Sequence, residues 1–317
     1  MVFRLYGATV ATVSATCRLP LLGLAILLST APAWVDGEPA APREAALELK
    51  GQALIVVGLP GDEEHEQLFA DTARQWRTWL TGTLGFNPAD VHVLFGRAGK
   101  DGLSQGPATR ATIEGEAARL RQSLRPDDRL WVFFLGHANY DGEHAWFHLP
   151  GPDLREDEAG KLFAGLHCRE QIFWMTTSES GRFVKSLSAK GRIVIAATRA
   201  GGEDNETEFP LALSTVAERP LAALDVEDGK LSVLQLYDRI LAEVQARYAA
   251  DGRVPTEHAQ LDDNGDGVGT ERPLVARQGK KIGSGDDGVL SMRTILPYPS
   301  PPKGAVSEPT KNLNPKP

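Results

Sequence analysis

Short apolar runs alternate with amphipathic stretches through the middle of the chain. The runs have the length of strands and are almost wholly apolar; they lie at residues 53–59, 91–95, 130–135, 171–176 and 192–197. Strands of this kind are buried on both sides, which is typical of a parallel sheet covered by helices. The pattern therefore predicts an α/β fold, a three-layer sandwich with a mostly parallel sheet between helices.

The stretches between the apolar runs have helical spacing. After the first run, apolar side chains recur every three or four residues, at Phe69, Ala73, Trp76, Leu80 and Leu84. A second helix is predicted after Thr109, whose hydroxyl can cap the first turn, and a long apolar stripe over 233–248 predicts another.

The amino-terminal segment differs from this middle part. Residues 1–33 contain Arg4 and Arg18, no acid, and an apolar run at 19–28 that is followed by Ala31-Pro32-Ala33. Positive charge, a short apolar run and small residues at a cleavage point are the features of a secretory signal peptide. We expect a signal peptide over 1–33 and a secreted or periplasmic protein. An uncleaved membrane anchor is the alternative.

The remaining chain divides into three parts. Residues 34–50 are rich in Pro and Ala and predict a linker, and residues 51–296 form one α/β domain with an acidic loop at 262–269. Residues 297–317 are Pro-rich and too polar to form a core, so this tail is expected to be disordered.

Charge and cysteine content exclude several classes of function. The chain has 34 Lys and Arg against 42 Asp and Glu, a net charge of −8, which argues against a nucleic-acid partner. Of its two cysteines, Cys17 lies in the leader, so the mature chain keeps only Cys168 and forms no internal disulfide. A single cysteine also argues against the usual cysteine-rich zinc sites.

Candidate reactive side chains follow two of the predicted strands. One strand ends in Gly136-His137-Ala138, and the next ends in Thr177-Ser178-Glu179-Ser180-Gly181. In parallel sheets, the chemistry lies at the carboxyl ends of the strands. A base and a nucleophile at neighbouring strand ends can meet there, which makes His137 and Ser178 a candidate catalytic pair.

In these segments the sequence resembles the caspase/legumain superfamily of cysteine peptidases, and most closely its legumain-like (asparaginyl peptidase) branch. In that superfamily one strand ends in Gly-His-Gly with the catalytic His, and the next major strand carries the nucleophilic Cys, within Ala-Cys-Glu-Ser-Gly in legumains. The resemblance covers roughly residues 50–220 and implies a caspase-like sandwich. It departs from the pattern at Ala138 and, more seriously, at Ser178, which stands at the Cys position.

The resemblance also implies roles for individual residues. His137 would be the general base and Ser178 the nucleophile, with the backbone N–H groups of Ser178 and Ala138 as the oxyanion hole. Glu179 would help to line the substrate pocket. Asp141 is a candidate to orient the imidazole, although the sequence shows no obvious third catalytic member.

A second candidate site is the acidic loop. Asp262, Asn264 and Asp266, followed by Gly267, match the start of an EF-hand calcium loop. Position twelve is Pro273 instead of Glu, so the alternatives are a shorter calcium loop, with these three residues as ligands, and a tight turn.

These observations leave three functional hypotheses. The first is an exported legumain-like hydrolase of peptide or amide bonds, whose activity is weak or lost because Ser replaces Cys. The second is a non-catalytic pseudoenzyme that binds peptides. The third is a calcium-binding extracytoplasmic scaffold. The expected partner is a peptide or protein, with a membrane only if the leader is uncleaved. The dyad requires no cofactor, and calcium is the one that the acidic loop suggests.

Overall fold

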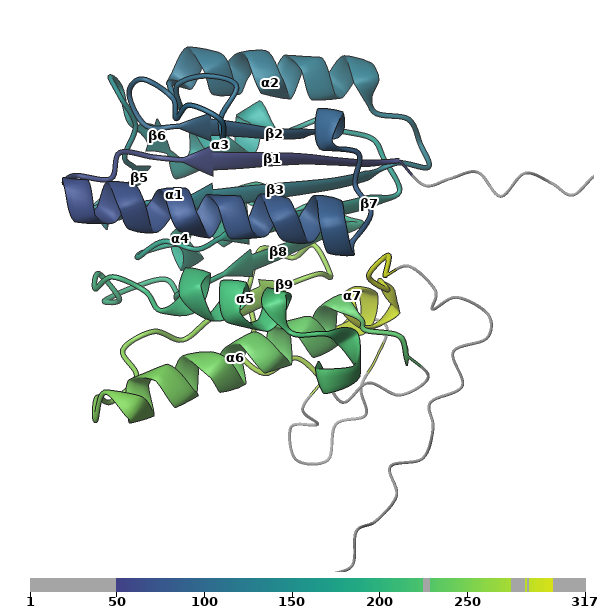
Figure 1. Ribbon diagram of the computed structural model, residues 1–317. Helices are drawn as coiled ribbons and strands as arrows, with labels where there is room; N and C mark the ends of the chain where they lie inside the picture. The colour runs from purple at the N-terminus through teal and green to yellow at the C-terminus, as the bar shows by residue number, and fades with distance from the viewer. Residues whose placement is uncertain (1–49, 225–228, 275–282, 284, 299–317) are drawn as a thin grey trace, which may run out of the picture. The chain divides into compact units, whose positions relative to one another are not determined.

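A six-stranded sheet forms the centre of the computed structural model, which describes residues 50–224, 229–274, 283 and 285–298 (Figure 1). Its strands lie in the order β2 (Val91–Phe95), β1 (Gly51–Val57), β3 (Arg129–Leu135), β7 (Glu170–Met175), β8 (Arg192–Ala196) and β9 (Gln260–Asp262). All neighbouring pairs are parallel except β8 with β9. The predicted mostly parallel sheet is thus confirmed.

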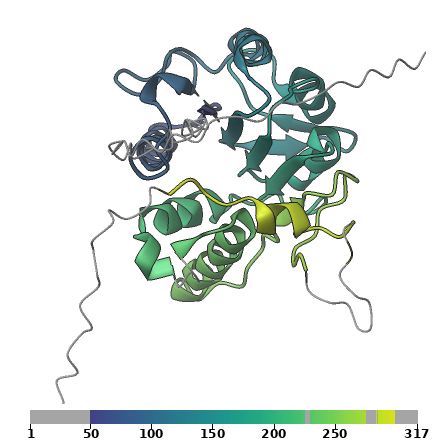
Figure 2. The same cartoon turned by 90° about the vertical axis from the view of Figure 1, so that its right-hand side faces the viewer.

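Helices cover both faces of this sheet (Figure 2). One face packs against α1 (Glu63–Thr78), α5 (Phe209–Glu218) and α6 (Val233–Ala250), and the other against α2 (Arg110–Ser123), α3 (Glu156–Leu162) and α4 (Gly181–Leu187). The short helix α7 (Val289–Arg293) lies beside α6. The described residues therefore form the predicted three-layer α/β sandwich.

The remaining elements are short. A small antiparallel sheet contains β4 (Ala138–Tyr140), β5 (Ala145–Phe147) and β6 (Leu154–Arg155). The π-helical turn η1 (Trp79–Thr83) continues α1, and the 3-10 turns are η2 (Pro88–Asp90) and η3 (Leu221–Leu224).

Polar residues at the helix starts satisfy backbone groups that the helix itself leaves unpaired. Thr109 caps α2 through a reciprocal pair of bonds with Thr112, as the sequence predicts, and Ser232 caps α6 in the same way with Gln235. Asp62 caps α1 by accepting from the backbone N–H of His65 at 2.8 Å. Caps of this kind contribute about 1 kcal/mol each.

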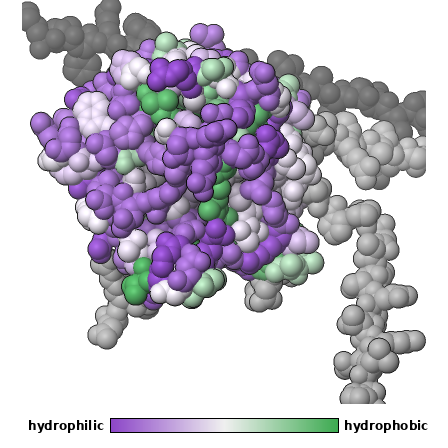
Figure 3. Space-filling model, turned by 60° about the vertical axis from the view of Figure 1, so that its left-hand side comes forward, coloured by the Kyte–Doolittle hydropathy of each residue, from purple (hydrophilic) through white to green (hydrophobic). Residues whose placement is uncertain are grey.

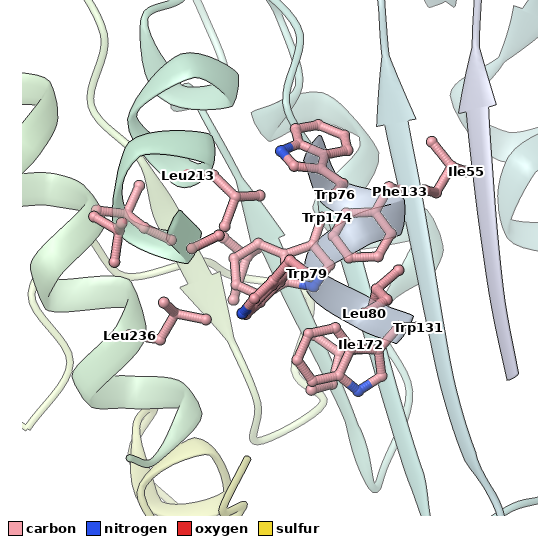
Figure 4. Close-up of a cluster of buried hydrophobic side chains, with 14 of the residues drawn as sticks. Ile55, Trp76, Trp79, Leu80, Trp131, Phe133, Ile172, Trp174, Leu213 and Leu236 are labelled. Carbon is pink, nitrogen blue, oxygen red and sulfur yellow. The ribbon is translucent and has the colours of Figure 1, made fainter. Parts of the chain in front are cut away.

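Strand side chains alternate between the two faces and build a core on each. In β3 all seven residues are buried, with Trp131 and Phe133 on the α1 side and Val132 and Phe134 on the α2 side. The α1 side contains an aromatic cluster (Figure 4), in which Phe133 and Trp174 stack at 5.9 Å with planes 3° apart. Truncating such a side chain to Ala costs about 3–5 kcal/mol.

Three predicted segments lie largely outside the described residues. The signal peptide at 1–33 and the linker at 34–50, except for residue 50, belong to these, as does the tail from residue 299 onward. Within the described part of the chain, no helix combines the length and apolar character that a membrane crossing needs.

Candidate functional site

The carboxyl ends of β3 and β7 adjoin at one edge of the sheet. The two strands pair in parallel, with Phe134 opposite Met175, so the segments that follow them leave the same edge side by side. His137 follows β3 and Ser178 follows β7. The surface seen in Figure 3 is mostly hydrophilic, with small hydrophobic patches. The parallel pairing of β3 and β7 thus brings the two predicted strand ends together.

Ser178 is hydrogen-bonded to the residue after His137. Its Oγ donates to the Ala138 carbonyl oxygen at 2.7 Å, and its side chain is largely buried. The His148 N–H donates to the His137 carbonyl, so Ala138 and Phe147 form a non-hydrogen-bonded pair of the β4–β5 ladder. Both backbone polar groups of Ala138 thus point away from β5, and its carbonyl meets Ser178.

The imidazole of His137 is held by a backbone carbonyl from a third strand end. Its Nε2 lies 3.0 Å from the Pro60 oxygen, just beyond β1. A carbonyl only accepts, so Nε2 carries the proton and Nδ1 is the basic nitrogen of the neutral ring. Gly136 makes this turn possible, because residues that have a Cβ rarely adopt its φ of 145°.

Asp141, the candidate for orienting the imidazole, closes the turn between β4 and β5. Its carboxylate accepts from the backbone N–H groups of Glu143 at 2.8 Å and His144 at 2.7 Å, and from Trp146 Nε1 at 2.7 Å. The His144 and Glu143 amides are the main reason that the pKa of Asp141 falls to about 2. Pro60 instead supplies the contact to His137. The position of Pro60 after a neighbouring apolar run places it at the same edge. Because every residue has a backbone carbonyl, however, the sequence does not single out this one as the partner of His137.

Glu179 has a strained backbone and a paired side chain. Its φ of 51° lies in the left-handed region, which residues other than Gly seldom occupy. The carboxylate accepts from Arg182 Nε at 2.7 Å and is nearly fully buried. The guanidinium of Arg182 in turn lies 3.3 Å from the centre of the Tyr140 ring. The carboxylate of Glu179 is therefore neutralised by Arg182 and shielded from solvent.

Ser180 and Gly181 tie this turn to the segment after β8. The Thr198 N–H donates to Ser180 Oγ at 3.0 Å. A Cβ on Gly181 would lie 2.3 Å from the carbonyl carbon of Arg199, so only Gly allows the two backbones to approach this closely. The Ser-Gly ending of the run is thus explained by packing, independently of any chemistry at Ser178.

Glu203 supports the same turn and is not marked by any sequence motif. Its backbone carbonyl accepts from the Glu179 N–H at 3.0 Å. Its buried carboxylate pairs with Arg199 Nε at 2.9 Å and His258 Nδ1 at 2.5 Å. This network fixes the segment after β8 against the residue that follows Ser178. Its members are far apart in the sequence, which is why sequence patterns miss it.

Two hollows flank the His137 side of the edge. One, of about 470 Å³, lies between the segments after β1 and β2 and is lined by Pro60, Asp62, Glu66 and Arg97, among others. The other, of about 170 Å³, lies between α1 and α5, with Phe69, Leu135 and Leu211 as apolar walls and Glu206 and Arg253 among its polar ones. His137 contacts one wall residue of each hollow, Pro60 in the first and Phe69 in the second.

The acidic loop follows β9, and backbone amides occupy its first carboxylate. Asp262 accepts from Gly265 N–H and Gly267 N–H, each at 3.0 Å. Asn264 Oδ1 accepts from Asp266 N–H, and Asp266 accepts from Val268 N–H, each at 2.8 Å. Among the described residues, no group of three or more His, Cys, Asp or Glu side chains could hold a metal ion. The calcium site with these three ligands stays a prediction.

Cys168 lies far from the segment that carries Ser178. It precedes β7 and so lies at the amino end of the strand, opposite to Ser178. Burial raises the pKa of its thiol to about 11, and its Sγ donates to the Glu170 carbonyl at 3.3 Å. A thiol in this state is inert near neutral pH.

Comparison with known proteins identifies no relative of this chain. No protein-family model matches the chain, and a search of the curated proteins gives no match. The assignment to the legumain-like branch therefore remains a prediction that rests on the residues around His137 and Ser178.

Proposed function

We propose that this chain is a legumain-like peptidase homologue that binds a peptide or amide at His137 and Ser178 and hydrolyses it weakly or not at all. The observation that carries the proposal is the hydrogen bond from Ser178 Oγ to the Ala138 carbonyl, at 2.7 Å. It links the two strand ends that would supply a base and a nucleophile, and it commits the Ser178 hydroxyl proton to a carbonyl oxygen instead of the imidazole.

The chemistry available to the pair is acyl transfer. Nδ1 of His137 would take the Ser178 proton as Oγ attacks the substrate carbonyl, and would then give that proton to the departing amine. Water would hydrolyse the resulting ester. The Ala138 N–H, which points away from β5, and the Ser178 N–H would face the developing oxyanion.

Three features of the site favour a low rate. The Ser178 proton is engaged by the Ala138 carbonyl, a hydrogen bond worth about 0.5–1.5 kcal/mol that attack must first break. The group that orients His137 is the neutral Pro60 carbonyl, which stabilises an imidazolium less than a carboxylate does. A serine hydroxyl also depends on its base more than a thiol does.

The second candidate is a peptide-binding protein without hydrolytic activity. The near-complete burial of Ser178 favours it, because a nucleophile has to reach the substrate carbonyl. In this case the two hollows, which include the His137 neighbours Pro60 and Phe69, would hold the ligand.

Replacing Ser178 by Cys tests the proposal. The Ser178→Cys variant is made with Cys168→Ser, so that residue 178 carries the only thiol of the described domain, and is assayed with a quenched peptide library. We expect cleavage well above that of the wild-type protein, inhibited by iodoacetamide. Adding His137→Ala should reduce it by about 10²-fold or more, the usual contribution of a general base.

Two outcomes would contradict the proposal. Wild-type cleavage at an ordinary rate of about 1–10³ s⁻¹ that survives Ser178→Ala would place the active site elsewhere. A Ser178→Cys variant that folds, yet neither cleaves nor binds any pool of the library, would remove the peptide site altogether. Binding of pools by fluorescence polarisation, without cleavage by the Cys variant, would support the second candidate.

A further inference from the structure

His65 lies between two carboxylates, one on each ring nitrogen. It belongs to the first turn of α1, where Nδ1 is 2.8 Å from Asp62 Oδ1. Nε2 is 3.2 Å from Oε1 of Glu206, which lies in the segment after β8. A neutral imidazole has one N–H and one lone pair, so it can donate to only one carboxylate. Both contacts are made together only when His65 is protonated.

The same ring packs on the candidate base. The centroids of His65 and His137 are 5.1 Å apart with the planes at 69°, and Phe69 lies 5.8 Å from His65 and 5.3 Å from His137. His137 is thus enclosed by the Pro60 carbonyl at Nε2 and by two rings from α1. A change in the position of His65 would therefore alter the packing around the His137 ring.

The His65–Glu206 contact also joins the two sides of the candidate site. Asp62 lines the hollow between the segments after β1 and β2, and Glu206 lines the pocket between α1 and α5. Three residues before Glu206, the Glu203 carbonyl holds the N–H of Glu179, the residue after Ser178. The segment that His65 ties down is therefore the one that supports the Ser178 turn.

We propose that His65 is a positioning residue that, when protonated, clamps the segment carrying Glu206 to the start of α1 and so holds the peptide site closed around His137. The effect on a peptide site rests on the proposed function. The contacts of His65 with Asp62 and Glu206 do not depend on it. Loss of the proton breaks one of the two contacts and so unties Glu206 from the start of α1, while the Glu203 network still holds the rest of the segment after β8.

The charges around His65 fix the pH range of the clamp. Asp62 faces it from its own helix, Glu206 from the segment after β8, and His137 from the end of β3. Hydrogen bonding to Asp62, and then to Glu206, raises the pKa of His65 above its ordinary value of 6.5. The His65 amide and imidazole lower the pKa of Asp62 below 3.8.

The sign follows from these two directions. A histidine with a raised pKa contributes stability that is complete below pH 6.5 and is lost as the pH rises through the folded-state value. A carboxyl with a lowered pKa contributes stability that is complete above pH 3.8 and is lost in stronger acid. The clamp therefore forms at mildly acid pH, below 6.5, and opens as the pH rises through the folded-state pKa of His65.

NMR titration of the imidazole protons tests the clamp without any assay of activity. In the wild-type chain His65 should titrate above 6.5, and in Glu206→Gln and Asp62→Asn its pKa should shift down toward that ordinary value. Amide hydrogen exchange of residues 203–207, corrected for intrinsic rates, should quicken by several-fold from pH 6 to pH 8 in the wild type only. Titration of His65 at or below 6.5, or unchanged in both variants, would overturn the clamp.

A second measurement connects the clamp to the site. With Ser178→Cys as the reporter, His65→Gln should raise KM several-fold and flatten its dependence on pH between 6 and 8, while kcat changes less. The matched control is His144→Gln, which removes another imidazole paired with a carboxylate, Glu156 at 2.9 Å. It should leave both KM and the pH dependence of KM unchanged. Equal effects of the two variants would overturn a role of His65 at the site. Failure of all peptide binding, with the NMR result intact, would instead contradict the proposed function.

Discussion

The carboxyl edge of the sheet and the acidic loop both concentrate polar side chains, yet they use them differently. In the loop, the carboxylates of Asp262 and Asp263 are buried and each accepts two backbone N–H groups. At the edge, His137 has one nitrogen held by a carbonyl and the other as the basic nitrogen, and the neighbouring strand end carries the strained residue Glu179. Polar groups that hold the backbone indicate a structural role, whereas an oriented base beside a strained turn is typical of a functional site.

The largest expected effect is in the loop region. Asp263 accepts from Gly288 N–H at 2.9 Å and Ser291 N–H at 2.6 Å, at the start of α7. We expect Asp263→Ala to lower the free energy of unfolding by about 3–5 kcal/mol, because it leaves buried donors without an acceptor. Urea denaturation measures this, with exposed Asp266→Ala as the control. A cost below about 1 kcal/mol would mean that the carboxylate does not hold α7.

A smaller effect is expected at Asp287, which lies beside the loop. Burial, and to a lesser extent the nearby Asp262 and Asp263, raise its pKa to about 6. A raised carboxyl pKa means that stability falls as the pH rises from 3.8 through 6, by about 2–3 kcal/mol in all, since one pKa unit is about 1.4 kcal/mol.

Asp287→Asn should therefore be more stable than the wild type at pH 7 and nearly equal to it at pH 4. Denaturation curves at both pH values measure the difference. If the variant is less stable at pH 7, the carboxylate has a stabilising charge partner, and the loop would be better explained as a cation site.

At the edge, removing the candidate nucleophile should change stability little. Ser178→Ala deletes one hydroxyl-to-carbonyl hydrogen bond and is expected to cost about 1 kcal/mol. The matched control, Ser180→Ala, should cost more, because Ser180 Oγ accepts the buried Thr198 N–H, which would lose its partner. Thermal denaturation compares the two, and a reversed order would make Ser178 the structural serine of the pair.

The smallest expected effect concerns calcium. Because backbone amides already occupy both carboxylate oxygens of Asp262, we expect the melting temperature to be the same in chelator and in millimolar calcium. A bound ion would stabilise the fold by about 2.7 kcal/mol at a hundredfold excess over its Kd, which calorimetry detects easily. A clear rise with calcium, absent in Asp266→Asn, would restore the loop as a metal site.

Five strands of the central sheet, the helices α1, α2 and α6, and the meeting of the His137 and Ser178 segments could be predicted from the sequence pattern. Apolar runs without a polar face identified β1, β3, β7 and β8, and Thr109 identified the start of α2. The parallel order of these strands also brought the ends after β3 and β7 to one edge, where His137 and Ser178 were expected. Hydrophobic periodicity and caps are properties of neighbouring residues, which is why one sequence suffices to find them.

The partners of the site residues were decided only by the tertiary structure. The Pro60 carbonyl, the Glu203 network and the pair of carboxylates around His65 come from segments up to 141 residues apart, and none has a motif. The expectation that Asp141 would orient the imidazole arose from closeness in sequence, but its carboxylate is held by the turn in which it lies. Local sequence determines which backbone forms, whereas hydrogen bonds between distant segments depend on how strands and loops are packed, and only the folded chain fixes that arrangement.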